Sequence, residues 1–184
     1  MTAATLLEGG LIVDGIGGPS WTGDVLLQGD RIARLGERLG EGLRGRLPRL
    51  PDPVRIEDID VVDCRGLVIA PGFIDAHTHD DAIVLQQPEM CPKLSQGVTT
   101  VVAGNCGISL APYATAQAGP PLNLLGAASF RHAGMHEYMQ AVDAARPAVN
   151  VAALVGHTTL RYATVGDLAR AATADERARM AALL

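Results

Sequence analysis

The sequence predicts a mixed α/β fold in which a small antiparallel β-region precedes parallel strand–helix–strand units. Short apolar runs separated by glycine-rich turns fill residues 5–35, a pattern typical of antiparallel strands. After Pro71-Gly72, apolar strands alternate with helical segments, which indicates parallel βαβ units. The chain has 184 residues, fewer than the roughly 200 to 250 of a complete (β/α)₈ barrel.

The first region is expected to contain short strands on either side of a long loop. Residues 36–57 have five arginines interleaved with four acidic residues and no aromatic residue. We interpret this segment as an exposed loop rather than a nucleic-acid-binding patch, which would combine basic and aromatic side chains. The expected strands are residues 5–7, 11–13, 25–27, 32–35, 61–63 and 67–70.

The second region begins near residues 60–72 and is expected to continue as βα units. Thr173 and Glu176 form a capping-box pattern, so a helix should start there. That helix runs to Leu184 without a stop signal, and we expect the chain to end inside an element. The other expected elements are strands 73–77, 98–102 and 149–155 and helices 91–96 and 136–146.

Composition and charge narrow the class of partner. Hydrophobic residues make up 48% of the chain and charged residues 19%, which excludes global disorder. The net charge of −5 provides no electrostatic footprint for nucleic acid or an anionic membrane, so a small molecule is the expected partner. Without a basic leader or a long apolar run, the sequence predicts a cytoplasmic protein.

The segment from Asp75 to Asp81, DAHTHDD, contains the first candidate metal ligands. Side chains alternate along a strand, so His77 and His79 should project to the same side, with Asp75 on that face too. Imidazole suits zinc, and Asp80 or Asp81 could orient a ligand. The alternative is one exposed histidine and one hydrogen-bonded in the core.

Cys106 is the second candidate. It lies just beyond the C-terminal end of the apolar strand 98–102, the end at which barrel enzymes place their chemistry. A thiolate is a good zinc ligand, although a small residue packed in a tight turn would also explain a cysteine here. Cys64 and Cys91 have no comparable surroundings and are interpreted as buried fillers.

Three motifs together resemble one enzyme family. DAHTHDD, GVTTVVAGNCG and NVAALVGHTTLR are similar to segments of the N-acyl-D-amino-acid deacylases, or D-aminoacylases, of the amidohydrolase superfamily. The resemblance implies a metal-dependent (β/α)₈ TIM barrel with a small β-sandwich built from both chain termini. Residues 1–70 would then be the sandwich-like region, and residues 71–184 the first βα units of an incomplete barrel.

The resemblance also implies a site and a reaction. Cys106 would bind the tightly held zinc, and His77 and His79 would belong to an adjacent, weaker metal position. The reaction would be hydrolysis of the amide of an N-acyl-D-amino acid to a carboxylate and a D-amino acid. Two further histidines and the general-base aspartate are expected after residue 184. No catalytic residue is therefore assigned here, and the chain is expected to be an inactive fragment.

Weaker candidates and alternative functions remain. His157 and Arg161 follow a parallel strand, where they could contact substrate or simply anchor the loop. Asn105 could donate a hydrogen bond near the metal, or it could be present because asparagine favours the glycine-rich turn in which it lies. The alternatives are a cyclic-amide hydrolase of the dihydroorotase or hydantoinase type and a non-catalytic metal-binding half-barrel. The sequence predicts no oligomeric state.

Overall fold

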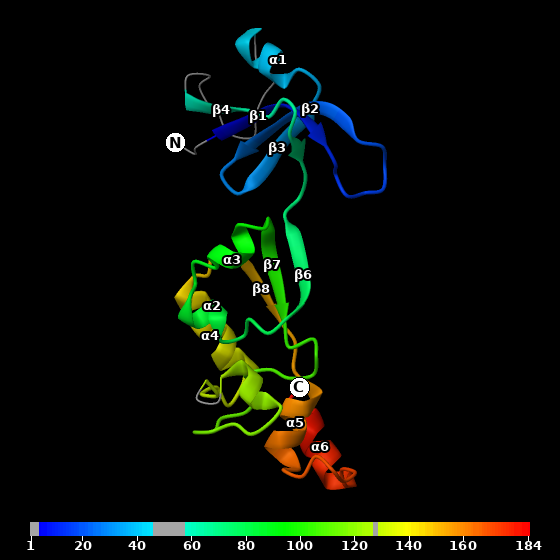
Figure 1. The fold of residues 1–184 in the computed structure, drawn as a ribbon, viewed down its shortest axis with the longest axis vertical. Coiled ribbons are helices and arrows are strands. Elements are labelled where there is room, and N and C mark those ends of the chain that lie inside the picture. Colours follow the sequence, from blue (N-terminus) through cyan, green and yellow to red (C-terminus); the bar gives the residue numbers. More distant parts are fainter. Residues whose placement is uncertain (1–3, 46–57, 127–128) are drawn as a thin grey trace. The chain divides into compact units, whose positions relative to one another are not determined.

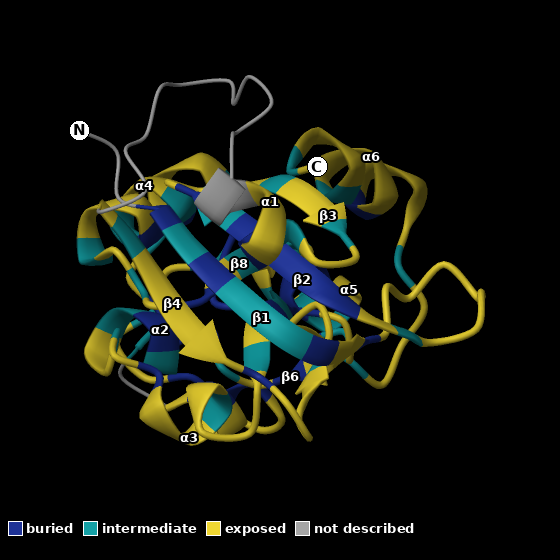
Figure 2. Cartoon of the chain, turned by 90° about the horizontal axis from the view of Figure 1, so that it is seen from above, coloured by how far each residue is buried: buried dark blue, intermediate teal, exposed yellow. Residues whose placement is uncertain are grey.

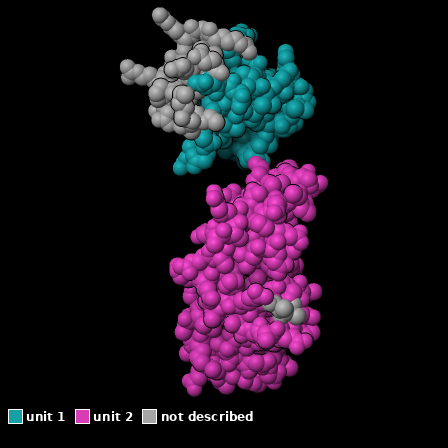
Figure 3. All heavy atoms as spheres, turned by 90° about the vertical axis from the view of Figure 1, so that its left-hand side faces the viewer, with its two compact units in different colours: residues 1–71 teal, residues 72–184 magenta. Residues whose placement is uncertain are grey.

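The computed structural model describes residues 4–45, 58–126 and 129–184. The chain forms two compact units, residues 1–71 and residues 72–184 (Figure 3). Unit 1 contains a five-stranded sheet, and unit 2 contains a three-stranded sheet with several helices (Figure 1). No helix among the described residues is long and apolar enough to cross a membrane.

The sheet of unit 1 is antiparallel on one side of its longest strand and parallel on the other. Its strands are β1 (Ala4–Ile12), β2 (Trp21–Gln28), β3 (Arg31–Gly36), β4 (Ile59–Asp63) and β5 (Val68–Ile69). The antiparallel pairing of β1 with β2 and of β2 with β3 confirms the antiparallel prediction for residues 5–35. The two separate strands expected at residues 5–7 and 11–13 are wrong, because both lie in the single strand β1, which ends at Ile12. Figure 2 shows β2 mostly buried and β4 exposed.

The antiparallel prediction is wrong for the last two strands, because β4 and β5 both run parallel to β1. The register of β1 with β2 shifts between Leu7 and Gly10, which marks a bulge or an irregularity there. Residues 4–8 of β1 pair with β4 and residues 11–12 pair with β5. The Arg65-Gly66 turn therefore connects β4 to β5 along the same edge of β1. The two strands pair with β1 on either side of the irregularity and do not form a hairpin with each other.

A short helix, α1 (Leu39–Gly45), occupies part of the segment predicted to be a loop. That prediction is wrong for these residues, and residues 46–57 lie outside the described residues. The buried carboxylate of Asp24 links the start of the helix to β1, because its oxygens accept hydrogen bonds from the backbone N–H groups of Gly9 (2.7 Å) and Gly40 (3.0 Å). An N–H group at the helix start thus gains a partner in the sheet.

The sheet of unit 2 is parallel and open, with the order β6 (Phe73–Thr78), β7 (Val98–Ala103), β8 (Asn150–Ala153). This confirms the predicted βαβ alternation. Figure 1 shows α2, α3 and α4 together on one side of the sheet. The helices of the unit are α2 (Ile83–Gln86), α3 (Cys91–Leu94), the 3₁₀ helix η2 (Leu122–Leu125), α4 (Met135–Ala145), α5 (His157–Thr164) and α6 (Ala174–Ala182).

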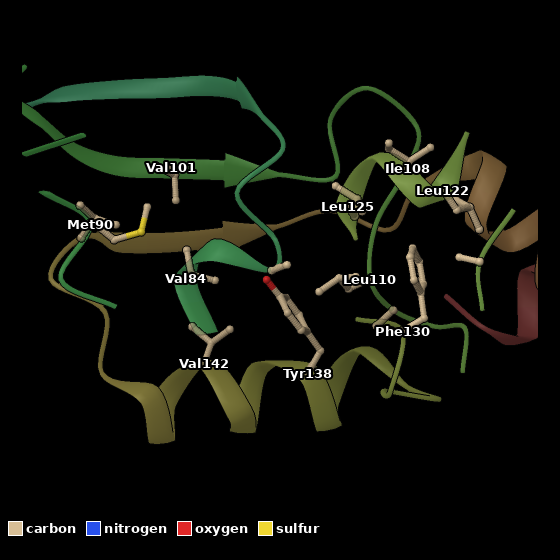
Figure 4. Close-up of a cluster of buried hydrophobic side chains, with 14 residues drawn as sticks. Val84, Met90, Val101, Ile108, Leu110, Leu122, Leu125, Phe130, Tyr138 and Val142 are labelled. Atoms are coloured by element: carbon tan, nitrogen blue, oxygen red, sulfur yellow. The ribbon is translucent and has the colours of Figure 1, made fainter. Parts of the chain in front are cut away.

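The core of unit 2 is formed by the sheet, by helices α2, η2 and α4, and by buried loop residues such as Ile108, Leu110 and Phe130 (Figure 4). Tyr138 and Val142 of α4 pack toward Val84 of α2, and Val101 of β7 is completely buried. The Tyr138 hydroxyl donates to the backbone oxygen of Asp81 at 2.9 Å, which satisfies its polar end inside the core. Because the helices cover this face, a functional site can form only on the opposite face of the sheet or at the C-terminal ends of its strands.

The capping box predicted for the last helix is present. The Thr173 hydroxyl accepts from the Glu176 backbone N–H at 3.2 Å, and the Glu176 carboxylate accepts from the Thr173 N–H at 2.8 Å. Arg170 also pairs with Glu176, and this hydrogen bond and those from Thr173 lower the pKa of that carboxyl to about 2. Local sequence is therefore sufficient to fix the start of α6.

Candidate metal centre

The structure brings the three strongest candidates together at the C-terminal edge of the parallel sheet. His77 lies near the end of β6, His79 follows that strand, and Cys106 lies in the loop after β7. One ligand atom from each residue lies within 4.8 Å of the other two. The Cys106 Sγ is 3.5 Å from Nδ1 and 3.4 Å from Nε2 of His79.

An irregularity in β6 sets the direction of the first histidine. Asp75 pairs with Val101 and Thr78 pairs with Ala103, so three residue steps of β6 match two steps of β7. Paired residues share a face of the sheet, and Val101 and Ala103 are fully buried under the helices. Asp75 and Thr78 therefore both face the helices, and alternation from Thr78 places His77 on the open face. The expectation that Asp75 shares a face with His77 is wrong, because it assumed a regular strand.

The two aspartates after His79 make different contacts from those expected. Asp80 accepts a hydrogen bond from Thr78 (2.7 Å) and pairs with Lys93 (2.9 Å). Asp81 is buried and accepts a hydrogen bond from the Leu110 N–H at 3.3 Å. Burial raises the pKa of Asp81 to about 6, and its Oδ2 has no partner among the described residues. Neither carboxylate accepts a hydrogen bond from a histidine in the described structure.

The loop that carries Cys106 is fixed to both neighbouring strands. The Asn105 side chain donates a hydrogen bond to the backbone oxygen of Ala76, the residue before His77, at 2.7 Å. Gly104 has φ +83°, and a Cβ placed on it would lie 2.1 Å from the backbone oxygen of Leu154. Glycine at this position thus permits the loop after β7 to lie directly against the backbone of Leu154, which follows β8. Any residue with a Cβ atom would prevent so close a contact.

Two buried hydroxyl residues hold this loop against α5. The Ser109 N–H donates to the Thr159 Oγ1 at 2.8 Å, and that hydroxyl donates back to the Ser109 carbonyl at 3.0 Å. The Ser109 hydroxyl in turn accepts from the Gly156 N–H at 2.9 Å. Sequence reasoning missed Ser109 and Thr159, because nothing in the local pattern relates positions fifty residues apart.

The two weaker candidates lie on α5, where the sequence suggested a loop. His157 is exposed at the first position of the helix. The Arg161 guanidinium donates to the backbone oxygens of Asp167, Leu168 and Arg170, at 3.3, 3.3 and 2.6 Å. These contacts are those of a residue that anchors a loop, and the substrate-binding role of both residues stays a prediction.

The chemistry of the donor set fits a zinc ion. Two imidazoles and one thiol are soft or borderline ligands that favour zinc over magnesium or calcium. Zinc binds sulfur at about 2.3 Å and imidazole nitrogen at about 2.0–2.1 Å, so tetrahedral ligands of these two kinds lie about 3.6 Å apart. The 3.4 Å between Cys106 Sγ and Nε2 of His79 is close to that value, and the ligand atoms of all three residues lie within 4.8 Å of one another.

Comparison with known proteins identifies the family. Residues 60–184 match the model of the amidohydrolase family. The chain belongs to the amidohydrolase family. This amidohydrolase chain is 48% identical to an N-acyl-D-aspartate deacylase and 41% identical to an N-acyl-D-glutamate deacylase, both of Alcaligenes xylosoxydans xylosoxydans. Each alignment covers 97% of this chain but only 33% and 34% of those relatives, so the chain spans about a third of their length.

Solved structures agree with this assignment. The amidohydrolase chain matches the crystal structure of D-aminoacylase with a TM-score of 0.83 and 48% identity, over 97% of this chain and 35% of that one. It matches N-acyl-D-glutamate deacylase from Bordetella bronchiseptica, complexed with zinc and a phosphonate inhibitor, with a TM-score of 0.81 and 40% identity. That alignment covers 98% of this chain and 35% of the other. The mixed α/β fold predicted from the sequence is thereby confirmed for the part of the fold that this chain contains.

Proposed function

We propose that this chain is the N-terminal part of a zinc-dependent deacylase that hydrolyses the amide bond of N-acyl-D-amino acids. The products would be a carboxylate and a free D-amino acid. The activity is proposed for the full-length protein, in which further strands close the barrel. The cytoplasmic location and the sandwich-like character of residues 1–70 stay predictions from the sequence.

The observation that carries this proposal is the contact between Cys106 and His79. An HxH pair at a strand end is common to several kinds of metal site, whereas a cysteine placed 3.4 Å from the second histidine restricts the choice. The relatives named above as deacylases of acidic N-acyl-D-amino acids support the same reaction. The phosphonate complex of one relative, described as a mimic of the tetrahedral intermediate, is consistent with acyl hydrolysis.

We assign the metal ligands to Cys106, His77 and His79 as one set, in place of the two metal positions that the resemblance implies, because one ligand atom from each lies within 4.8 Å of the other two. A zinc ion bound there would supply Lewis-acid chemistry, polarising a carbonyl and lowering the pKa of a water molecule to near neutrality. Asn105 would keep the cysteine loop against β6, since its amide already holds the Ala76 carbonyl. The general base that takes the proton from water would be an aspartate outside these 184 residues.

The proposal is tested by assaying the full-length protein with paired substrates. We expect hydrolysis of N-acetyl-D-glutamate or N-acetyl-D-aspartate, with the L-enantiomers slower by about 100-fold or more, which corresponds to roughly 3 kcal/mol of discrimination. Removal of metal with a chelator should abolish the activity and added zinc should restore it. Hydrolysis of dihydroorotate or a hydantoin instead, with no turnover of any N-acyl-D-amino acid, would contradict the proposal.

A further inference from the structure

Lys93 is the only lysine in the sequence, in which the other fourteen of the fifteen basic residues are arginines. It lies in α3, and its side chain is only 23% exposed. Its Nζ lies 2.6 Å from Asp75 Oδ2, 2.9 Å from Asp80 Oδ2 and 3.1 Å from Thr78 Oγ1. An ammonium has three N–H donors, so each can be directed to one of these three oxygens.

The three oxygens come from residues that alternate with the two histidines. Asp75, Thr78 and Asp80 contact the ammonium, whereas His77 and His79 lie between them in the sequence. The irregular register of β6 turns Asp75 and Thr78 toward the helices, and Asp80 follows the end of that strand. Lys93 therefore holds the HxH segment at its beginning, middle and end, on the side opposite to the histidine cluster.

The contacts extend to the backbone of the first histidine. The Asp75 carboxylate accepts a hydrogen bond from the His77 N–H at 3.2 Å through Oδ1, while its Oδ2 binds Lys93. A charged carboxylate held in place by the ammonium is thus the partner of the His77 amide.

A lysine suits this place better than an arginine. Its ammonium is a compact charge that can contact three converging oxygens from one atom, whereas a guanidinium spreads its donors over a planar fork. Removal of the cation would leave two partly buried carboxylates, Asp75 and Asp80, without their shared partner. We expect the segment to lose its fixed geometry in that case.

We propose that Lys93 is a positioning residue that fixes the β6 segment so that His77 and His79 face Cys106. The proposal rests on the proposed function only for the identity of the metal that these side chains bind. Lys93 touches neither metal nor substrate, and it acts through Asp75, Thr78 and Asp80.

The test compares Lys93→Met with the wild type in the full-length protein, using two measurements. Hydrogen–deuterium exchange of the metal-free protein should show the His77 amide, which donates to Asp75, exchanging about tenfold faster in the variant. Zinc titration should show affinity lower by about 10- to 100-fold, the usual loss when a partner that orients a ligand is removed. Arg31→Met removes the same charge from an exposed ion pair in unit 1 and should change neither measurement.

A second variant keeps the test valid if Lys93→Met does not fold. Lys93→Met with Asp75→Asn removes one uncompensated carboxylate while keeping an oxygen that can accept from the His77 N–H, and it should show the same weakened zinc binding. Unchanged exchange at the His77 amide, or faster exchange with wild-type zinc affinity, would overturn the inference. If the wild type itself bound no zinc, the proposed function would fail, and the exchange measurement would still decide whether Lys93 fixes this segment.

Discussion

Replacing Cys106 with alanine should remove tightly bound zinc from the full-length protein and abolish hydrolysis of N-acyl-D-amino acids. The thiolate is the one anionic ligand in the proposed set, and its sulfur lies 3.4 Å from the nearer nitrogen of His79. Without it, two neutral imidazoles remain in this part of the site, a poor environment for a divalent cation. We expect zinc affinity to fall by roughly 100-fold or more and activity to fall with it.

Metal analysis after dialysis against a chelator, together with the deacylase assay, measures both effects. The interpretation of Cys91 as a buried residue is wrong, because Cys91 is exposed, whereas Cys64 is buried as expected. Cys91→Ala is therefore the matched control, since Cys91 is also an exposed free thiol but is not part of the histidine cluster. The control should keep its zinc and its activity. Stoichiometric zinc in the Cys106→Ala protein after the same dialysis would exclude Cys106 as a ligand.

Gly104→Ala should destabilise the loop that carries the cysteine. A Cβ at this position would lie 2.1 Å from the Leu154 carbonyl oxygen and 2.9 Å from its carbon, both backbone atoms that no side-chain rotation can move away. The residue also has φ +83°, which is strained for alanine. Strain and overlap together should lower the free energy of unfolding by about 3 kcal/mol.

Urea denaturation of the full-length protein measures this loss. Gly18→Ala in unit 1 makes the matched comparison, because its Cβ would meet no atom within 4 Å and its φ is not positive. Its change should stay within about 0.5 kcal/mol. Equal stability of the two variants would show that the backbone of residues 104 and 154 separates easily, contrary to the close contact described above.

The sequence predicted the elements whose signals are local. The alternation of strands and helices after Pro71 and the capping box at Thr173 follow from patterns within a few residues, and the approach of Cys106 to the histidines follows from the parallel order of the two strands that carry them. The C-terminal ends of neighbouring parallel strands meet at one edge of a sheet, so the proximity of that cysteine to the HxH pair could be expected before the fold was known.

The errors arose where distant residues determine the backbone. The sequence prediction assumed that side chains alternate regularly along β6, which placed Asp75 on the same face as the histidines. The irregular register with β7 and the contact with Lys93 instead turn Asp75 toward the helices. Helix α5 has a sequence with two adjacent threonines that does not favour a helix by itself. The hydroxyl of its Thr159 is hydrogen-bonded to the backbone of Ser109, a partner that no local sequence pattern reveals. The isolated lysine among fourteen arginines was the one sequence signal that could have indicated the role of position 93.

The central claim is that zinc is bound by the thiolate of Cys106 together with histidine nitrogens. X-ray absorption at the zinc edge of the purified full-length protein tests it most directly, because sulfur and nitrogen ligands differ in distance. The account predicts one sulfur at about 2.3 Å and nitrogen or oxygen ligands at about 2.0–2.1 Å. A first shell of nitrogen and oxygen alone, with no sulfur at that distance, would contradict it.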